Sequence, residues 1–169
     1  SALAVKTVHD YVTANVDTPL DQLLEAALQQ TNQTIWEAAR KNHRLMEMGT
    51  TAAVVAITND VAYVAHVGDS RAYMVRGDEV AQLTRDHTMV NLFVDAELLT
   101  PEDAATHPEA HVLSRSLGVE RQVEVELSEP IPILEDDVLF LCSDGVHGVV
   151  TDWELANIDW AEPHSGIRH

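Results

Sequence analysis

The sequence is poor in cysteine, aromatic residues and positive charge. It has one cysteine, Cys142, and 5% aromatic residues, and 28 acidic residues stand against 10 lysines and arginines, for a formal net charge of −18. A single cysteine excludes an intramolecular disulfide framework. The acidic excess argues against nucleic acid or an anionic membrane as a partner, because both would be repelled. An acidic protein can still handle phosphate where divalent cations supply the positive charge.

Long apolar runs are missing as well. No stretch approaches the ~20 residues needed to cross a bilayer, and the N-terminus lacks the charged region and apolar core of a signal peptide. Together with the single cysteine, these features favour a soluble protein of the reducing cytoplasm. The sequence does contain 46% hydrophobic residues among 169, which suits one compact domain.

The first half of the chain predicts two helices followed by strands. Apolar residues recur at helical spacing over 3–12 and 18–43, and Thr18 followed by Pro19 at the first helical position is typical of a helix start. From residue 50, short runs of Ala, Val and Ile alternate with turn residues. The expected strands span residues 50–58, 61–67, 71–75 and 79–83. Their short connections predict a four-stranded antiparallel meander.

The second half predicts a helical flap and then a return of strands. The flap covers about residues 87–112, where the strand pattern is lost. The expected elements are a helix over 89–98, a helix starting at Thr100, strands over 122–127 and 137–142, and a helix starting at Thr151. Helices segregated from an antiparallel sheet define the α+β class. We therefore expect one domain over residues 1–158 and a tail over 159–169.

Two acidic turns carry the candidate metal ligands. Asp69 lies between two expected strands and precedes Ser70, and Asp144 follows an apolar strand, between Ser143 and Gly145. A carboxylate beside glycine at a strand end directs its oxygens into a cleft, and Mg²⁺ and Mn²⁺ prefer oxygen ligands. Each aspartate taken singly is also typical of a turn or a helix cap, so the pattern alone leaves both interpretations open.

Four segments in order carry a resemblance to a known family. They are residues 48–51 (Met-Gly-Thr-Thr), 66–73 (His-Val-Gly-Asp-Ser-Arg-Ala-Tyr), 83–88 (Leu-Thr-Arg-Asp-His-Thr) and 141–145 (Leu-Cys-Ser-Asp-Gly). In this order they resemble the metal-dependent protein phosphatases of type 2C, in their bacterial form. The resemblance implies a sandwich of two antiparallel β-sheets flanked by helices, with metals in a cleft at the sheet ends.

The resemblance also implies an activity and a set of site residues. Family members hydrolyse phosphoserine and phosphothreonine with Mn²⁺ or Mg²⁺, so the expected substrate is a phosphorylated protein or a small phosphomonoester. Asp144 matches an aspartate of the central metal pair, and Asp69 matches one that helps to hold a third metal. Ser143, Gly145 and Ser70 adjoin these ligands. A water shared by two divalent ions would attack phosphorus, with no covalent enzyme intermediate.

One flap residue departs from the family pattern. His111 falls near a position that can face the third metal and is often a small polar residue in the family. The imidazole at this place is therefore expected to be structural or to face solvent.

Two motifs of the family have no counterpart in the chain. The signature Asp-Gly-x-Gly-Gly-His should precede the helix that starts at Ser1, and a closing Asp-Asn motif should follow on the last strand. The resemblance then predicts a sandwich truncated at both ends, in which Asp69 and Asp144 alone bind a metal weakly. Such a chain is a phosphatase or a catalytically impaired, phosphatase-like binding or regulatory module. Uncovered sheet edges predict a homodimer that pairs through them.

Nucleophilic mechanisms find less support in the sequence. Gly68-Asp69-Ser70 also resembles the Gly-Asp-Ser box of a serine esterase family, in which Ser70 attacks and Asp159 and His164 assist. That box belongs near the N-terminus of an α/β fold, whereas Ser70 lies among antiparallel strands. Cys142 lacks the Cys-x5-Arg pattern of a phosphocysteine mechanism, because position 148 is glycine. We expect neither side chain to act as a nucleophile.

Overall fold

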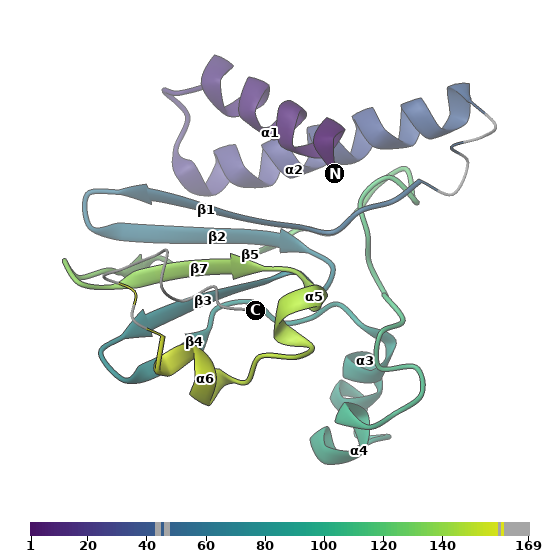
Figure 1. Ribbon diagram of the computed structural model, residues 1–169. Coiled ribbons are helices and arrows are strands. Elements are labelled where there is room, and N and C mark those ends of the chain that lie inside the picture. The colour runs from purple at the N-terminus through teal and green to yellow at the C-terminus, as the bar shows by residue number, and fades with distance from the viewer. Residues whose placement is uncertain (43–44, 46–47, 159, 161–169) are drawn as a thin grey trace.

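The computed structural model of the chain describes residues 1–42, 45, 48–158 and 160, and the expected tail lies outside them except for Trp160. Two long helices cover one sheet, and a second sheet lies beneath the first (Figure 1). The helices are α1 (Ala2–Ala14) and α2 (Leu20–Lys41), as the apolar spacing predicts. Pro19 differs from the prediction: its ψ of 139° is extended, so it caps α2 instead of beginning it.

The first sheet is built on the predicted hairpin. Its strands are β1 (Ala52–Thr58), β2 (Val61–Val67), β5 (Glu126–Leu127) and β6 (Ile131–Pro132), and β2 pairs with the other three. Thr58 pairs with Val61 across a two-residue turn. Asn59 and Asp60 have φ values of 46° and 62° there, the left-handed conformation that a tight hairpin turn requires.

The second sheet corrects the predicted meander. It contains β4 (Glu79–Gln82), β3 (Arg71–Arg76) and β7 (Val138–Cys142) in that order, so β2 and β3 belong to different sheets. Between them, Gly68 at φ 104° turns the chain from one sheet to the other. The meander prediction is wrong because a short connection can join two stacked sheets as well as two neighbouring strands. The predicted α+β arrangement of antiparallel sheets flanked by helices is confirmed.

Helices begin where they are expected, at Met89 and after Thr100 and Thr151, but the first ends at Asp95 instead of residue 98. The strand expected at 122–127 is mostly irregular. Only Glu126–Leu127 pair as β5, while Val123 and Val125 pack partly buried against the core without joining the ladder. The short helices are α3 (Met89–Asp95), α4 (Pro101–Ala105), α5 (Asp144–His147) and α6 (Asp152–Ala156). Helix α5 is not predicted by the sequence pattern, because four residues are too few to show a period.

The core lies between the helices and the two sheets. α2 packs Leu24, Leu28 and Ile35 onto β2, whose Ala65 and Val67 are fully buried. β2 is buried on both faces because α2 covers one side and the second sheet the other. No helix among the described residues is long and apolar enough to cross a membrane.

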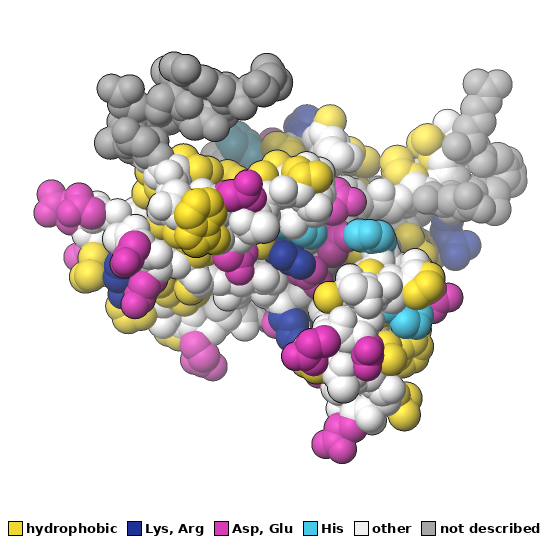
Figure 2. Space-filling view, turned by 60° about the horizontal axis from the view of Figure 1, so that its bottom comes forward, with side chains coloured by type: hydrophobic (Ala, Val, Ile, Leu, Met, Phe, Trp, Pro, Cys, Tyr) yellow, Lys and Arg dark blue, Asp and Glu magenta, His cyan; other side chains and the backbone are white. Residues whose placement is uncertain are grey.

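One face of the molecule shows how acidic side chains are distributed on it (Figure 2). The face shown in Figure 2 carries separate acidic side chains over several elements, with few basic ones between them. The acidic residues on this face therefore do not form one block.

Candidate metal centre

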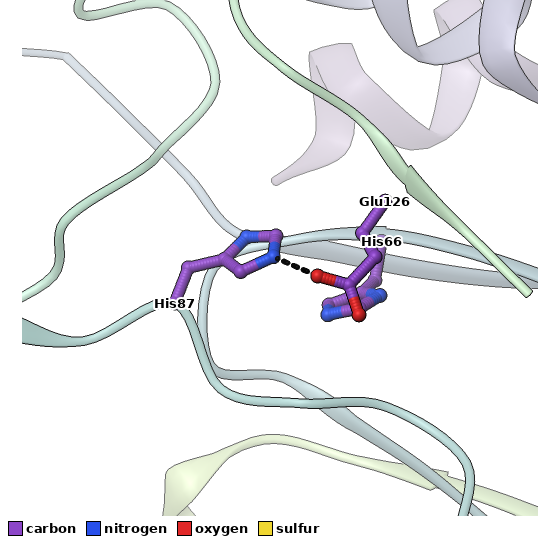
Figure 3. Close-up of side chains that lie close together, drawn as sticks. All are labelled: His66, His87 and Glu126. Atoms are coloured by element: carbon purple, nitrogen blue, oxygen red, sulfur yellow. Dashed lines mark hydrogen bonds and ion pairs between the residues drawn. The ribbon is translucent and has the colours of Figure 1, made fainter. Parts of the chain in front are cut away.

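Two groups of side chains in the described residues have the chemistry of metal ligands. One is a cluster of His66 on β2, His87 before α3 and Glu126 on β5, whose ligand atoms lie within 4.8 Å of one another (Figure 3). Sequence spacing does not reveal it, because β2, β5 and the segment before α3 meet only in the folded chain. The spacing suits one cation, but the ring nitrogens of His87 already hold hydrogen bonds to Gly68 and Glu126.

The other group consists of the two acidic turns predicted from the sequence. In the β3–β7 pair, Arg71 lies opposite Cys142. Asp69 comes two residues before Arg71 and Asp144 two residues after Cys142, and antiparallel strands bring these two positions to the same end of the pair. The register of one strand pair thus gathers residues that are far apart in the sequence.

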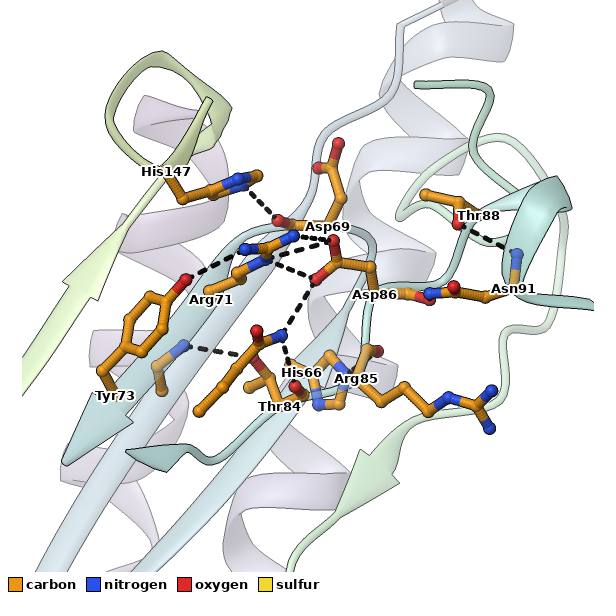
Figure 4. Close-up of polar contacts among 12 residues, drawn as sticks. His66, Asp69, Arg71, Tyr73, Thr84, Arg85, Asp86, Thr88, Asn91 and His147 are labelled. Carbon is orange, nitrogen blue, oxygen red and sulfur yellow. Dashed lines mark hydrogen bonds and ion pairs between the residues drawn. The ribbon is translucent and has the colours of Figure 1, made fainter. Parts of the chain in front are cut away.

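A histidine that the sequence analysis missed ties the two turns together. The Nε2 of His147 lies 3.0 Å from the backbone carbonyl oxygen of Asp69, to which it donates (Figure 4). His147 stands at the end of α5, three residues after Asp144, and this spacing puts both side chains on one side of a helical turn. The signal was present in the sequence as Asp-Gly-Val-His, but only the fold shows what the imidazole reaches.

The electrostatics of the turns favour a bound cation. Asp69 is half-buried, and burial raises the pKa of its carboxyl group, with a further rise from the charges of Asp144 and Asp86. Asp144 itself is exposed. A carboxylate whose pKa is raised by a neighbouring negative charge is stabilised in its charged form by a bound cation. The hard oxygen donors of Asp69 and Asp144 therefore fit one Mg²⁺ or Mn²⁺ ion, although two carboxylates supply only part of its coordination shell.

A charged pair braces the segment behind Asp69. The Nε of Arg71 donates to both carboxylate oxygens of Asp86, at 2.9 and 3.1 Å, and a terminal nitrogen donates to one of them at 2.7 Å. Burial opposes the charge of Arg71, but the hydrogen bonds from Arg71 to Asp86 and Tyr73 raise its pKa above the ordinary value. Asn91 of α3 donates to the carbonyl oxygen of Asp86 at 2.7 Å, so the pair also anchors the flap (Figure 4).

The other site residues that the sequence predicts, beside the two aspartates and in the flap, lie in different surroundings. The hydroxyl of Ser70 is 2.8 Å from that of Thr51, at the start of β1. Ser143 and Gly145 are exposed, and Ser143 Oγ, at 3.6 Å, is the nearest atom to where a side chain on Gly145 would stand. His111 is exposed in a turn of the flap.

Neither nucleophilic interpretation gains support. Ser70 shares its hydrogen bond with Thr51, and the two partners that an esterase would need, Asp159 and His164, lie outside the described residues. Cys142 is half-buried, and burial raises the pKa of its thiol, which lowers the fraction present as the nucleophilic thiolate.

A groove opens beside the turns. It has a volume of about 700 Å³, and its walls come from α1, β1 and the end of β7. Val5 and Val8 of α1 and Val55 of β1 make it apolar, while Ser70 and Ser143 line it next to Asp69 and Asp144. The candidate centre therefore lies beside this groove.

Comparisons with known proteins agree with the fold. The Protein phosphatase 2C family profile matches residues 1–92. The chain is 35% identical over 139 residues to "Serine/threonine phosphatase stp" of Listeria innocua, covering 82% of this chain and 55% of that protein. A structure of the Streptococcus agalactiae serine/threonine phosphatase superposes with a TM-score of 0.80 at 32% identity, covering 91% of this chain and 65% of that one.

A third relative is described with bound metal. The catalytic domain of the serine/threonine protein phosphatase PstP, in complex with 2 manganese ions, has a TM-score of 0.70 and 29% identity, over 92% of this chain and 66% of that one. With two antiparallel sheets, acidic turns at one sheet end and a family match over more than half of its residues, the chain belongs to the protein phosphatase 2C family. It spans 55% of the length of the Listeria relative.

Proposed function

We propose that the chain contributes part of the metal centre of a protein phosphatase that hydrolyses phosphoserine and phosphothreonine with Mn²⁺ or Mg²⁺. The observation that carries the proposal is the β3–β7 register, which supports Asp69 and Asp144 as ligands of one cation. The raised pKa of Asp69, caused by burial and by the charge of Asp144, and the hard oxygens of both residues fit such an ion. When bound, a divalent cation supplies a water of lowered pKa and neutralises charge on the phosphate oxygens.

The chain's own residues orient this centre. His147 holds the backbone of Asp69, and Asp86 occupies the guanidinium of Arg71, so that this arginine braces the turn instead of contacting phosphate. In the proposal, Ser143 and Ser70 flank the ligands and Gly145 leaves space beside Asp144. His111 remains a flap residue that faces solvent.

The proposed substrates are phosphorylated proteins, with small phosphomonoesters as simpler substitutes, and the proposed role is in signalling within the cytoplasm. The acidic charge of −18 supports a centre that relies on metal ions to attract phosphate, and it argues against nucleic acid as a partner. We propose residues 1–158 as the phosphatase-like unit, with the flap at about 87–112.

The test compares Asp144→Asn with Asp78→Asn as a matched control. Asp78 also lies next to a glycine, in the turn at the opposite end of β3, so its loss removes the same charge away from the centre. We expect Asp144→Asn to weaken Mn²⁺ binding, measured by calorimetry, by roughly tenfold or more, and to lower Mn²⁺-dependent hydrolysis of a phosphothreonine peptide in parallel. Asp78→Asn should match the wild type in both measurements. Hydrolysis that persists in excess EDTA and is unchanged in Asp144→Asn would contradict the proposal.

A second candidate is a phosphatase-like module that binds a phosphoprotein or a partner without turnover. Two carboxylates are few for an ion that takes six oxygen ligands, and this favours the second candidate for the isolated chain. Binding of the phosphothreonine peptide without hydrolysis at saturating Mn²⁺ would support it. Robust Mn²⁺-dependent turnover by the pure chain would remove it.

We also propose that the chain forms a homodimer. The outer edges of β1 and β7 have no strand partner in the part of the chain that the structure describes, and both edges border the apolar groove. Unpaired edges and apolar surface are both stabilised by a second copy.

A further inference from the structure

The two peptide groups that flank Gly68, the residue before Asp69, are held by one histidine. The backbone N–H of Gly68 donates to Nδ1 of His87 at 3.1 Å, and the backbone N–H of His87 donates to the carbonyl oxygen of Gly68 at 3.0 Å. Both residues are buried. Gly68 is thus bonded through its N–H and its carbonyl oxygen to the same residue, directly before the candidate ligand.

The ring of His87 is itself fixed from three sides. It stacks on His66, with ring centroids 4.5 Å apart and 20° between the planes, and its Nε2 lies 3.0 Å from a carboxylate oxygen of Glu126 (Figure 3). Nη1 of Arg115 lies 3.4 Å from the same nitrogen. His66 is anchored in turn, because its Nε2 donates to the carbonyl oxygen of Arg85 at 2.8 Å.

These contacts determine the tautomer of His87. A backbone N–H can only donate, so Nδ1 must carry a lone pair, and the proton of the neutral ring is on Nε2, where Glu126 accepts it. A cation bound at Nε2 would need a lone pair on Nε2, so the proton would have to leave the ring or move to Nδ1, where it would break the bond to Gly68. The nearby guanidinium of Arg115 adds a repelling charge. The cluster is accordingly a chain of hydrogen bonds from Glu126 to Gly68.

We propose that His87 is a positioning residue for the metal centre: through Nδ1 it holds the N–H of Gly68, and so the backbone conformation of the residue before Asp69 and the place of the Asp69 carboxylate relative to Asp144. The proposal rests on the proposed function of Asp69 and Asp144. Its physical basis is that a change in the backbone dihedral angles of Gly68 moves the start of Asp69, whose carbonyl oxygen His147 holds from the other side. Small displacements of such groups cause large losses in binding and catalysis.

Two substitutions separate the nitrogens of the ring. In His87→Asn the amide oxygen can stand where Nδ1 stands and accept from Gly68, while the contact to Glu126 is lost. In His87→Gln the amide reaches the place of Nε2 and keeps Glu126, while the acceptor for Gly68 is lost. The two variants are neutral and similar in size, so the difference between them reports on the Gly68 bond.

The experiment measures Mn²⁺ affinity by calorimetry and the exchange rate of the Gly68 amide by NMR, for the full chain and both variants. We expect His87→Gln to weaken Mn²⁺ binding by roughly tenfold and to speed Gly68 exchange, and His87→Asn to stay close to the wild type in both. Circular dichroism checks that each variant is folded. If His87→Gln does not fold, the pH profile of Mn²⁺ affinity is measured for His87→Asn and the wild type instead. In the wild type, protonation of Nδ1 breaks the bond to Gly68 and so changes the Mn²⁺ affinity with pH. His87→Asn should lack this pH-dependent change.

The outcomes keep the two proposals apart. Equal Mn²⁺ affinity and slow Gly68 exchange in His87→Gln, in a chain whose affinity does depend on Asp144, would overturn the positioning role and leave the proposed function standing. If the wild type binds no Mn²⁺, the proposed function fails, and with it the role of His87 in a metal centre. A pH profile that is the same in His87→Asn and the wild type would likewise overturn the proposal.

Discussion

At the scale of the residue, one glycine determines how the chain passes between the sheets. Gly68 has a φ of 104°, which side-chain-bearing residues rarely adopt, and a Cβ there would stand 2.2 Å from Cγ2 of Thr51. Thr51 in turn bonds to Ser70 through its hydroxyl. The close approach of these segments packs the acidic turn against the start of β1, and only a residue without a side chain permits it.

Gly68→Ala is therefore expected to be severely destabilising. The added methyl group combines backbone strain with a clash in a buried place, and we expect the free energy of unfolding to fall by about 2–5 kcal/mol. Gly77→Ala is the matched control, because Gly77 also has a positive φ, of 62°, but nothing lies within 4 Å of its Cβ position. Its cost should be only the strain, about 1–2 kcal/mol. Urea unfolding gives both values. Equal losses in the free energy of unfolding for the two variants would contradict a clash at Gly68.

At the scale of the element, β3 organises the second sheet. It pairs with β4 on one side and β7 on the other, and its two ends carry the acidic turn and Arg76. The guanidinium of Arg76 donates to both carboxylate oxygens of Asp137, at 2.8 and 2.6 Å, and Asp137 also accepts from the N–H of Leu134 at 2.7 Å. These bonds fasten the turn before β7 to β3 and so support the register that brings Asp69 and Asp144 to one end of the strand pair.

The pair makes this part of the sheet sensitive to acid. The hydrogen bond from Arg76, with that from Leu134, lowers the pKa of Asp137 to about 2 from an ordinary value of 3.8. A depressed carboxyl pKa contributes stability that is complete above the ordinary value and is lost as the pH falls toward the folded-state value. We expect Asp137→Asn to remove this contribution, so that the variant loses less stability than the wild type between about pH 4 and pH 2.

The neighbouring Asp136 supplies the control. It is exposed and lies next to Asp137, so Asp136→Asn changes the net charge by the same amount without touching Arg76. Urea midpoints measured across the acid range should run parallel for Asp136→Asn and the wild type. Parallel curves for Asp137→Asn and the wild type would show that the Arg76 bonds contribute nothing to folding.

At the scale of the whole molecule, the groove lies beside the outer edges of β1 and β7. α1 packs mainly against α2, and its Val5 and Val8 line the groove beside β1. A second copy could pair with either edge and cover this apolar surface. The net charge of −18 opposes association at low salt, so pairing should strengthen as salt screens the repulsion.

Substitutions on the groove test the homodimer. Val5 and Val16 are both 71% exposed, but only Val5 lines the groove. We expect light scattering to give a dimer mass for the wild type and for Val16→Lys at physiological salt, and a monomer mass for Val5→Lys. Because both positions are exposed, neither substitution should unfold the monomer. A monomer mass for the wild type at every concentration and salt would contradict the homodimer.

The elements with local signals could be predicted from the sequence. Apolar spacing places α1 and α2, and Asn59–Asp60 marks the first hairpin turn. The four ordered motifs indicate the family, and they contain Asp69 and Asp144. Within the strand expected at 122–127, only Glu126–Leu127 pair, and they pair with β2. This could not be predicted, because it depends on which part of the β2 edge is free in the folded chain.

The sequence by itself determined the acidic excess, the helices, the hairpins and the two aspartates beside glycine, because each depends on residues that are neighbours in the chain. Only the tertiary structure decided that β2 and β3 separate into different sheets, that the β3–β7 register aligns Asp69 with Asp144, and that His147 and His87 hold the Asp69 turn. These contacts join residues that no local pattern relates. They form because burial of both faces of β2 and pairing of both edges of β3 leave few other ways to pack the chain.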